Sequence, residues 1–282
     1  MIDGEDVHVA PGAFDGLTTR LVERAGFDLV YASGGAIARS AGVPDIGLVS
    51  FAEVVDRLTS MAEVTSLPIL ADADTGFGNE VNAARTVRAY ERIGMAGLHI
   101  EDQSFPKRCG HLDDKSLVPV EEMVLKLRSV LAARTDPDFV VVARTDAIAV
   151  EGLDAALDRA RAYLDAGADV IFVEAPETVE QVEAVAEAIP EPKLINMFHG
   201  GKTPVVPLER LRELGYRLVI VPSDLQRAAV AAVERTLRAI REDGDSSSLS
   251  GELTPFSRRE EIVRTRDYLS GAVFTERSAE PV

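Results

Sequence analysis

The sequence of 282 residues contains a single cysteine, Cys109, and no run of 18 apolar residues. One cysteine forms no intrachain disulfide, which favours a reducing compartment, the cytoplasm. The first twelve residues carry acids where a signal peptide carries Lys or Arg, and a membrane-spanning helix needs about 18 or more apolar residues. The sequence therefore predicts a cytoplasmic protein that is not secreted and does not cross a membrane.

Positive charge is scarce as well. Lys and Arg total 30 against 47 Asp and Glu, which gives a net charge of -17. Because nucleic-acid phosphates bind to positive patches, nucleic acid is a poor partner. Only five of the basic residues are Lys, and this composition predicts a halophilic protein whose hydrated acidic surface keeps it in solution at high salt. A GC-rich genome is the alternative explanation of the arginine bias.

Short runs rich in Val, Ile and Leu alternate with stretches of helical periodicity along most of the chain. Eight such runs predict strands, which begin at Val7, Asp28, Pro68, Ala96, Phe139, Asp169, Lys193 and Leu218. Strands too apolar to have one face in water indicate a parallel sheet covered by helices, and closing eight such units gives a barrel. The sequence therefore predicts an α/β fold, a (β/α)₈ TIM barrel in a single domain over residues 1–282. An open doubly wound sheet is the alternative, but the segment after the first strand lacks its G-x-G-x-x-G phosphate loop.

The connections between the strands carry further signals. Helices are predicted over 81–92 and 153–166, and glycine turns at 25–28, 93–96, 166–169 and 214–217 are typical of helix ends. A last helix over 257–269 lies beyond the eighth unit. We expect the C-terminal extension, 250–282, to pack on a neighbouring subunit.

Polar residues gather at the predicted carboxyl ends of six of the eight strands, where barrels of this kind form their active sites. Asp72 and Asp74 are two residues apart, so on a strand they point to the same side. With Glu101 from the next strand they form an oxygen-rich site that suits Mg²⁺, or Mn²⁺. No His-x-x-His or Cys-x-x-Cys spacing competes for zinc. The alternative is that Asp74 only caps the turn at 75–78.

Other strand ends predict anion binding. Ser33, Gly34 and Gly35 end an apolar strand in a flexible turn, whose backbone N–H groups suit a carboxylate or carbonyl oxygen. Arg144 and Asn196 are candidate oxyanion ligands, since a guanidinium matches a carboxylate. Glycine pairs in barrel loops and single arginines also occur for purely structural reasons.

The segment KRCGH, residues 107–111, places Cys109 beside Lys107, Arg108 and His111. Neighbouring cations lower the pKa of a thiol from about 8.5 toward neutrality, where a group donates and accepts protons efficiently. Gly110 lets the backbone approach a ligand closely. Cys109 is therefore the predicted acid–base group, with Lys107 and His111 in its catalytic surroundings. An inert thiol is the alternative, and the polar neighbours disfavour it.

Four motifs, YASGG (31–35), DADTGFG (72–78), HIEDQ (99–103) and KRCGH (107–111), resemble those of the isocitrate lyase and phosphoenolpyruvate mutase superfamily. More narrowly, the chain is similar to the 2-methylisocitrate lyase group over residues 8–240. The resemblance implies an Mg²⁺-dependent retro-aldol lyase that cleaves a 2-hydroxy acid, most directly 2-methylisocitrate to pyruvate and succinate. It also implies a homotetramer in which the last helix is exchanged between subunits.

The resemblance also implies a role for each site residue. Tyr31 would assist with the hydroxyl proton, and Cys109 would protonate the enolate. The metal would lie near Asp72, Asp74 and Glu101. The residues implied in substrate binding are Ser33, Gly34, Gly35, Asp45, Gly110, Arg144, Glu174, Asn196, Arg227 and Arg258.

The acid that is cleaved stays open at this point. The GGKTP segment, 200–204, is more similar to 2,3-dimethylmalate lyases and to oxaloacetate and malate lyases, whereas AIAVEGLDAA, 147–156, is more similar to 2-methylisocitrate lyases. A related alkylmalate lyase is therefore one alternative. An oxaloacetate decarboxylase or hydrolase, which needs no thiol acid, is another. A catalytically silent acid-binding barrel is the alternative outside the enzymes.

Overall fold

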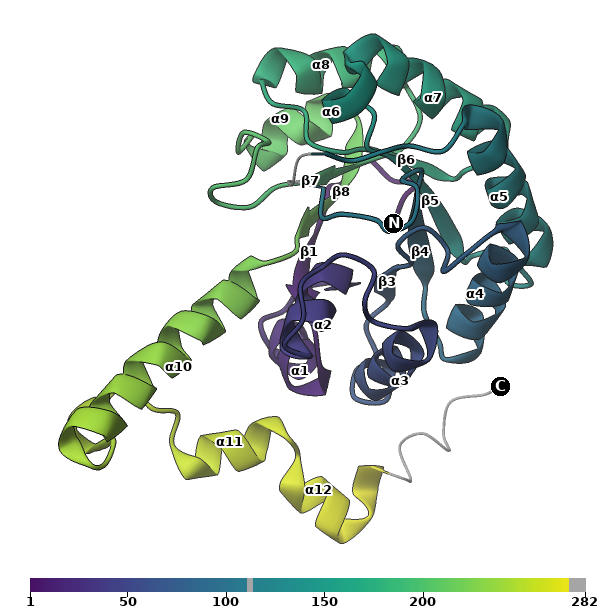
Figure 1. Ribbon diagram of the computed structural model, residues 1–282. Helices are drawn as coiled ribbons and strands as arrows, with labels where there is room; N and C mark the ends of the chain where they lie inside the picture. The colour runs from purple at the N-terminus through teal and green to yellow at the C-terminus, as the bar shows by residue number, and fades with distance from the viewer. Residues whose placement is uncertain (111–113, 274–282) are drawn as a thin grey trace. The chain divides into compact units, whose positions relative to one another are not determined.

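The computed structural model describes residues 1–110 and 114–273. Eight parallel strands form a closed barrel in chain order, which confirms the predicted barrel and rules out the open sheet (Figure 1). Each strand begins within two residues of its predicted start. The strands are β1 (His8–Ala13), β2 (Val30–Ala32), β3 (Ile69–Asp72), β4 (Gly97–Glu101), β5 (Val140–Thr145), β6 (Val170–Val173), β7 (Lys193–Asn196) and β8 (Tyr216–Val221).

Helices surround the strands on the outside of the barrel (Figure 1). They are α1 (Gly16–Arg24), α2 (Gly34–Ser40), α3 (Phe51–Ala62), α4 (Glu80–Arg92), α5 (Val120–Ala133), α6 (Ile148–Glu151), α7 (Leu153–Asp165), α8 (Val179–Ala188) and α9 (Leu208–Glu213). The predicted helices 81–92 and 153–166 are α4 and α7. The glycine predicted to end each of four helices has a positive φ, between 76° and 106°, where another residue would cost about 1–2 kcal/mol.

Alternate residues along the strands face two separate apolar cores, as the two-residue period of a strand requires. Val30, Ile69 and Leu98 belong to the core under the helices. Leu70 and Phe172 belong to a second cluster, which fills the barrel interior. Fully burying one such side chain contributes roughly 1.5–3 kcal/mol. The polar side chains at the strand ends therefore stand on an apolar floor and not on a water-filled channel.

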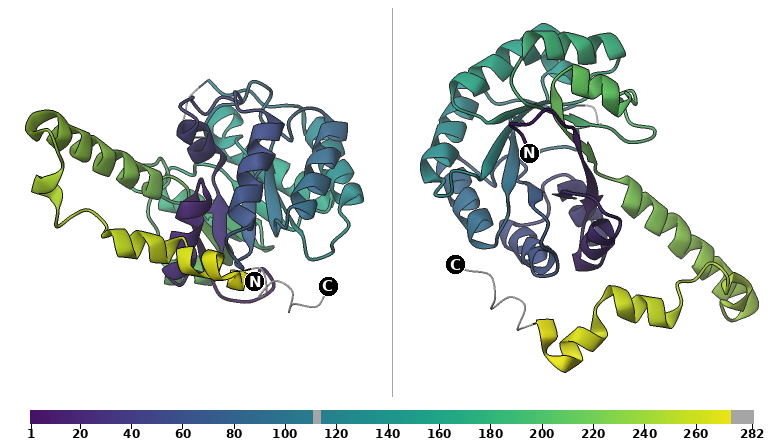
Figure 2. Two further views of the ribbon diagram at one scale, coloured as in Figure 1. Left: turned by 90° about the horizontal axis from the view of Figure 1, so that it is seen from below. Right: turned by 180° about the vertical axis from the view of Figure 1, so that it is seen from behind.

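The chain divides into two compact units, Met1–Gln226 and Arg227–Val282. The second unit contains most of α10 (Asp224–Asp243), together with η1 (Ser247–Leu249), α11 (Phe256–Ile262) and α12 (Thr265–Ser270). The prediction of one helix over 257–269 was wrong, because Arg264 adopts a left-handed φ of 58° that separates α11 from α12. The bend between these two yellow helices is visible in Figure 2.

Within the second unit, Arg235 of α10 forms an ion pair with Glu252 at 2.9 Å. Among the helices that the structure describes, none combines the length and the apolar character needed to cross a membrane.

Candidate active site

Charged side chains from neighbouring strands meet at the carboxyl end of the barrel. Arg144 of β5 has its Nε 3.4 Å from Glu101 Oε2 of β4 and its Nη1 3.8 Å from Glu174 Oε2, just past β6. Asn196 of β7 donates from Nδ2 to Glu174 Oε1 at 3.3 Å. All four side chains are buried. The structure thus brings together four of the predicted site residues in one polar cluster.

Lys107 lies among a second group of carboxylates. Its Nζ contacts Asp45 Oδ1 and is 2.6 Å from Asp74 Oδ1. Asp74 lies past the end of β3 with a left-handed φ of 46°, and its N–H donates to Asp72 Oδ1 at 2.9 Å. Asp72 and Asp74 therefore come together through the loop after β3. The sequence had suggested that both lie on the strand and point to the same side. The side chain of Asp74 faces Lys107.

Tyr31, His99 and Asp72 form a buried triad beside these carboxylates. The Tyr31 hydroxyl lies 2.8 Å from His99 Nε2 and donates to Asp72 Oδ2 at 3.2 Å. Burial lowers the pKa of His99 to about 4, so its imidazole is neutral near pH 7. Burial also raises the pKa of Tyr31 well above its ordinary value, so the phenol keeps its proton. His99 had no predicted role, although it alternates with Glu101 on β4 and so faces the same side.

Negative charge is costly in both groups of carboxylates, because the side chains are buried above the apolar barrel interior. Burial raises the pKa of Glu101 well above its ordinary value and that of Asp74 to about 6. Burial also disfavours charge on Lys107, but Asp74 and Asp45 outweigh it and hold its pKa well above the ordinary value. A further cation close to these carboxylates would favour their charged forms.

The donor atoms of this cluster fit a hard metal ion. Among the described residues, Glu101 Oε1 and Asp74 Oδ1 are buried oxygens that accept no hydrogen bond, although Lys107 Nζ lies close to the second. Mg²⁺ and Mn²⁺ prefer such carboxylate oxygens. No three His, Cys, Asp or Glu side chains in residues 1–110 and 114–273 form a ready ligand group. The residues thus have the right chemistry for Mg²⁺, with Lys107 lying against Asp74.

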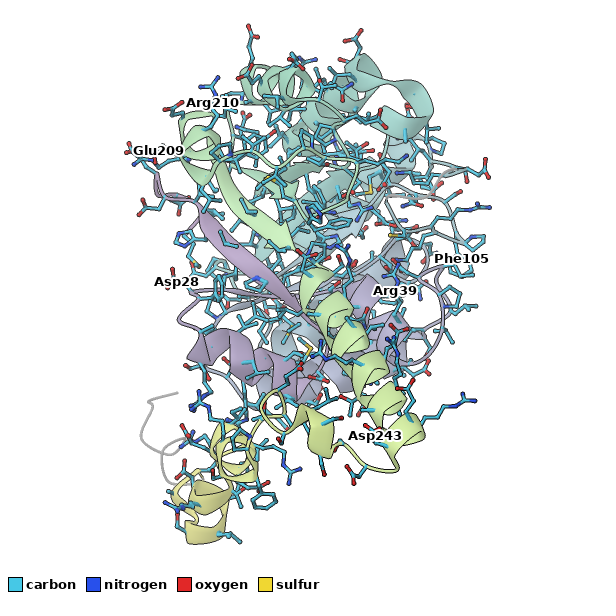
Figure 3. All side chains as sticks on the ribbon, turned by 90° about the vertical axis from the view of Figure 1, so that its left-hand side faces the viewer. Asp28, Arg39, Phe105, Glu209, Arg210 and Asp243 are labelled. Atoms are coloured by element: carbon cyan, nitrogen blue, oxygen red, sulfur yellow. The ribbon has the colours of Figure 1, made fainter. Side chains whose placement is uncertain are left out.

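Cys109 sits on the loop between β4 and α5, and its side chain is partly exposed. The loop tip enters the polar cluster at Gly110, where a Cβ atom would be 2.5 Å from Arg144 Nη2 and 2.7 Å from Glu174 Oε1. Earlier in the loop, Phe105 is 72% exposed and projects at the edge of the molecule (Figure 3). Arg108 pairs with Asp114 at 3.6 Å, and His111 lies outside the described residues.

The predicted anion-binding turn at Ser33 is the start of a helix. Ser33 Oγ accepts from Ala36 N–H at 3.3 Å and so caps α2. The Gly34 N–H donates to Asp72 Oδ2 at 3.2 Å. At Gly35 a Cβ would be 2.8 Å from Asp45 Oδ2, so a larger residue would push Asp45 away. Gly34 and Gly35 lie against carboxylates of the site, and the contact of all three residues with a substrate stays a prediction.

Two predicted substrate arginines, Arg227 and Arg258, belong to the second unit. Arg258 is exposed on α11 and pairs with Glu261 at 2.9 Å. Their participation in the site stays a prediction.

Known proteins are similar to this chain in sequence and in fold. A family model described as phosphoenolpyruvate phosphomutase matches residues 2–241. A protein of Corynebacterium glutamicum named probable 2-methylisocitrate lyase 1 is 46% identical over 278 residues, which cover 97% of this chain and 91% of that protein.

Solved structures are similar over the same extent. The crystal structure of 2,3-dimethylmalate lyase has a TM-score of 0.90 at 35% identity, and the match covers 95% of this chain and 90% of that one. A phosphonopyruvate hydrolase in complex with oxalate and Mg²⁺ has a TM-score of 0.87 at 32% identity, over 95% of this chain and 94% of that one. The chain therefore belongs to the phosphoenolpyruvate mutase and isocitrate lyase superfamily, and it is a carbon–carbon lyase.

Proposed function

We propose that the protein cleaves 2-methylisocitrate to pyruvate and succinate, with Cys109 as the general acid. The observation that carries the proposal is the close approach of Gly110 to Arg144 and Glu174. A Cβ atom placed on Gly110 would lie within 2.7 Å of side-chain atoms of both residues. This approach brings the residue next to Cys109 against Arg144, whose guanidinium suits a substrate carboxylate. The similarity to the Corynebacterium glutamicum protein supports the choice of substrate.

Binding begins with the fixed charge of Arg144. Its guanidinium is buried and is held by Asp146 through two hydrogen bonds, of 2.8 and 3.0 Å. A guanidinium fixed in this way can donate hydrogen bonds to a substrate carboxylate without a further loss of side-chain conformational entropy. Asn196, 7% exposed at the end of β7, offers a neutral donor to a second oxygen of the acid.

In net terms, cleavage moves one proton from the substrate hydroxyl to the succinate carbon and leaves the electron pair of the broken C–C bond on that carbon. The substrate hydroxyl loses its proton to a base, the oxygen forms the carbonyl of pyruvate, and the bonding pair of the C–C bond stays on the succinate carbon as an enolate. Cys109 donates its thiol proton to that carbon, and the proton taken from the hydroxyl finally restores the thiol. Tyr31, which keeps its own proton, is our candidate to assist at the hydroxyl as a hydrogen-bond donor.

Asp72, Asp74 and Glu101 are the residues proposed to hold Mg²⁺, with Mn²⁺ as a substitute. When bound, the ion would supply positive charge to the oxygens on which negative charge develops during cleavage. The buried Oε1 of Glu101, which accepts no hydrogen bond among the described residues, supports this assignment.

Removal of divalent ions is expected to abolish turnover. After dialysis against EDTA, pyruvate release should fall to background, and added Mg²⁺ or Mn²⁺ should restore it, because the carboxylate cluster alone repels an anionic substrate. Circular dichroism before and after dialysis controls for unfolding. Full activity after chelation would contradict the metal assignment.

The substrate is tested with a coupled assay for pyruvate. We expect kcat/KM to be highest for 2-methylisocitrate when it is compared with 2,3-dimethylmalate, other alkylmalates and oxaloacetate at equal Mg²⁺. Pyruvate formation from 2-methylisocitrate should be accompanied by an equal amount of succinate. Absence of cleavage of 2-methylisocitrate, or a higher kcat/KM for another acid, would contradict the proposal.

A 2,3-dimethylmalate lyase is the second candidate. It is supported by the GGKTP segment at 200–204 and by the similarity to the solved 2,3-dimethylmalate lyase. The two acids differ at one carbon, which carries a carboxymethyl group in 2-methylisocitrate and a methyl group in 2,3-dimethylmalate. A site that pairs the extra carboxylate discriminates against the acid that lacks it much more strongly than it would against a missing methylene. The ratio of kcat/KM for the two acids decides between them.

A homotetramer fits the surface of α10. Val230, Val233 and Leu237 are spaced three and four residues apart, so they share one helix face, and each is more than half exposed. We propose that a second copy of the chain packs against this face. The cytoplasmic location and the adaptation to high salt also stay predictions.

A further inference from the structure

The loop that carries Cys109 is closed at its base by backbone pairing. Gln103 and Leu117 form an antiparallel bridge. The Ser104 N–H donates to Ser116 O at 2.8 Å, and the Val118 N–H donates to Asp102 O at 2.9 Å. This pairing fixes where the loop leaves and rejoins the barrel. It leaves the position of the tip, with Cys109, to be set by other contacts.

Gln103 supplies the first of these contacts. Its Nε2 donates to the Arg108 carbonyl, and its Oε1 accepts from the Arg108 N–H, each at 2.8 Å. The Gln103 side chain is buried, with 1% of the residue exposed. The carboxamide therefore satisfies both backbone groups of the residue that precedes Cys109, as a strand neighbour would.

Lys115 supplies the second contact, on the other side of the thiol. Its Nζ donates to the Gly110 carbonyl at 2.6 Å and to Asp146 Oδ1 at 2.8 Å. The Lys115 side chain is 1% exposed. An ammonium buried to this degree needs such partners, and the pair connects the residue after Cys109 to Asp146, the residue that follows β5.

Asp146 is itself rigidly held. Its backbone N–H donates to Asp102 Oδ1 at 3.0 Å, and Asp102 Oδ2 accepts from Thr145 Oγ1 and Tyr163 Oη at 2.7 and 2.8 Å. Burial opposes the charge of Asp146, but Arg144 and Lys115 hold its pKa well below the usual range. One carboxylate thus fixes both the substrate arginine and the lysine that holds the loop.

We propose that Lys115 and Gln103 are positioning residues, which hold the backbone on both sides of Cys109 so that its thiol stays at the carboxyl end of the barrel. Through Asp146, Lys115 sets the position of the proton donor relative to Arg144. The catalytic meaning of this position rests on the proposed role of Cys109, but the positioning itself is measurable without turnover.

The test uses Lys115→Met and Gln103→Leu, with alkylation of Cys109 by iodoacetamide as the readout. Because the chain has one cysteine, the rate reports this thiol alone. The plateau rate above the thiol pKa reports access, independently of how the substitution changes ionisation. We expect the plateau rate to rise about tenfold or more in each variant, since a lost charge-assisted or paired hydrogen bond shifts a local opening by that factor.

Lys193→Met is the matched control. Lys193 is also a buried lysine that donates to backbone carbonyls, those of Ile189 and Glu191, at 2.7 and 3.0 Å. It begins β7 and so lies at the opposite end of the barrel from Cys109. Its substitution removes similar hydrogen bonds, so it should change the thermal midpoint without changing the alkylation rate.

Kinetics separate positioning from general destabilisation. In Lys115→Met and Gln103→Leu we expect kcat to fall at least tenfold with a smaller change in KM, because substrate is still bound by Arg144. Alkylation at the wild-type rate in both variants would overturn the proposal. If Lys115→Met fails to fold, Gln103→Leu decides alone. If Cys109 has no role in turnover, the alkylation rates still report whether the two residues hold it.

Discussion

Replacing Cys109 with Ser is expected to lower kcat for 2-methylisocitrate by about 10²–10⁴-fold, the usual contribution of a general acid or base. A serine hydroxyl has nearly the shape of the thiol but releases its proton far less readily near pH 7. The enolate of succinate would therefore be protonated by water, and more slowly. The coupled pyruvate assay measures the loss, and an unchanged circular dichroism spectrum shows that the fold is retained.

The same variant discriminates between the candidate reactions. A decarboxylase or hydrolase acting on oxaloacetate needs no proton from Cys109, so it would keep much of its activity in Cys109→Ser. A lyase that uses the thiol as its acid would not. Retention of more than about a tenth of the pyruvate release from 2-methylisocitrate would contradict the role of Cys109, whatever the result with oxaloacetate.

The barrel and much of the candidate site follow from local sequence signals. A parallel strand that is buried on both faces must be apolar throughout, and this pattern marked all eight strands. Here the helices bury the outer face and the barrel interior buries the inner face. Closure into a barrel then places the residues that follow the strands at one end. That is why Glu101, Arg144, Glu174 and Asn196, far apart in sequence, were expected together and lie together.

Other features depend on contacts that no local pattern encodes. Lys107 was grouped with Cys109 as a neighbouring cation, but its ammonium lies between Asp45 and Asp74, which come from two other loops. No contact of Lys115 or Gln103 with the loop tip was predicted, because their partners are backbone groups of the same loop and the carboxylate of Asp146, just past β5. The break at Arg264 carries no glycine or proline, so its helical periodicity predicted a continuous helix.

Replacing Gly110 with Ala is expected to lower kcat by about 100-fold or more while leaving the fold intact. Gly110 is not among the residues with a positive φ, so its backbone accepts Ala, and only the space around it matters. A Cβ there would be 2.5 Å from Arg144 Nη2 and 2.7 Å from the Glu174 carboxyl. Arg144 is held by Asp146 through two hydrogen bonds. The added methyl group is therefore expected to displace the loop and not the guanidinium. A displacement of the loop by about 1 Å costs on the order of 10²-fold in rate.

Gly251→Ala is the matched control for this substitution, because a Cβ at Gly251 meets nothing within 4 Å and its φ is not positive. It adds the same methyl group without displacing a side chain, so its kcat should equal that of the wild type. The thermal midpoint of Gly110→Ala should stay close to the wild-type value, since the loop lies above the apolar core. A wild-type kcat in Gly110→Ala would mean that contact of the loop tip with Arg144 and Glu174 is not required for catalysis. Another residue at the carboxyl end of the barrel would then have to protonate the enolate.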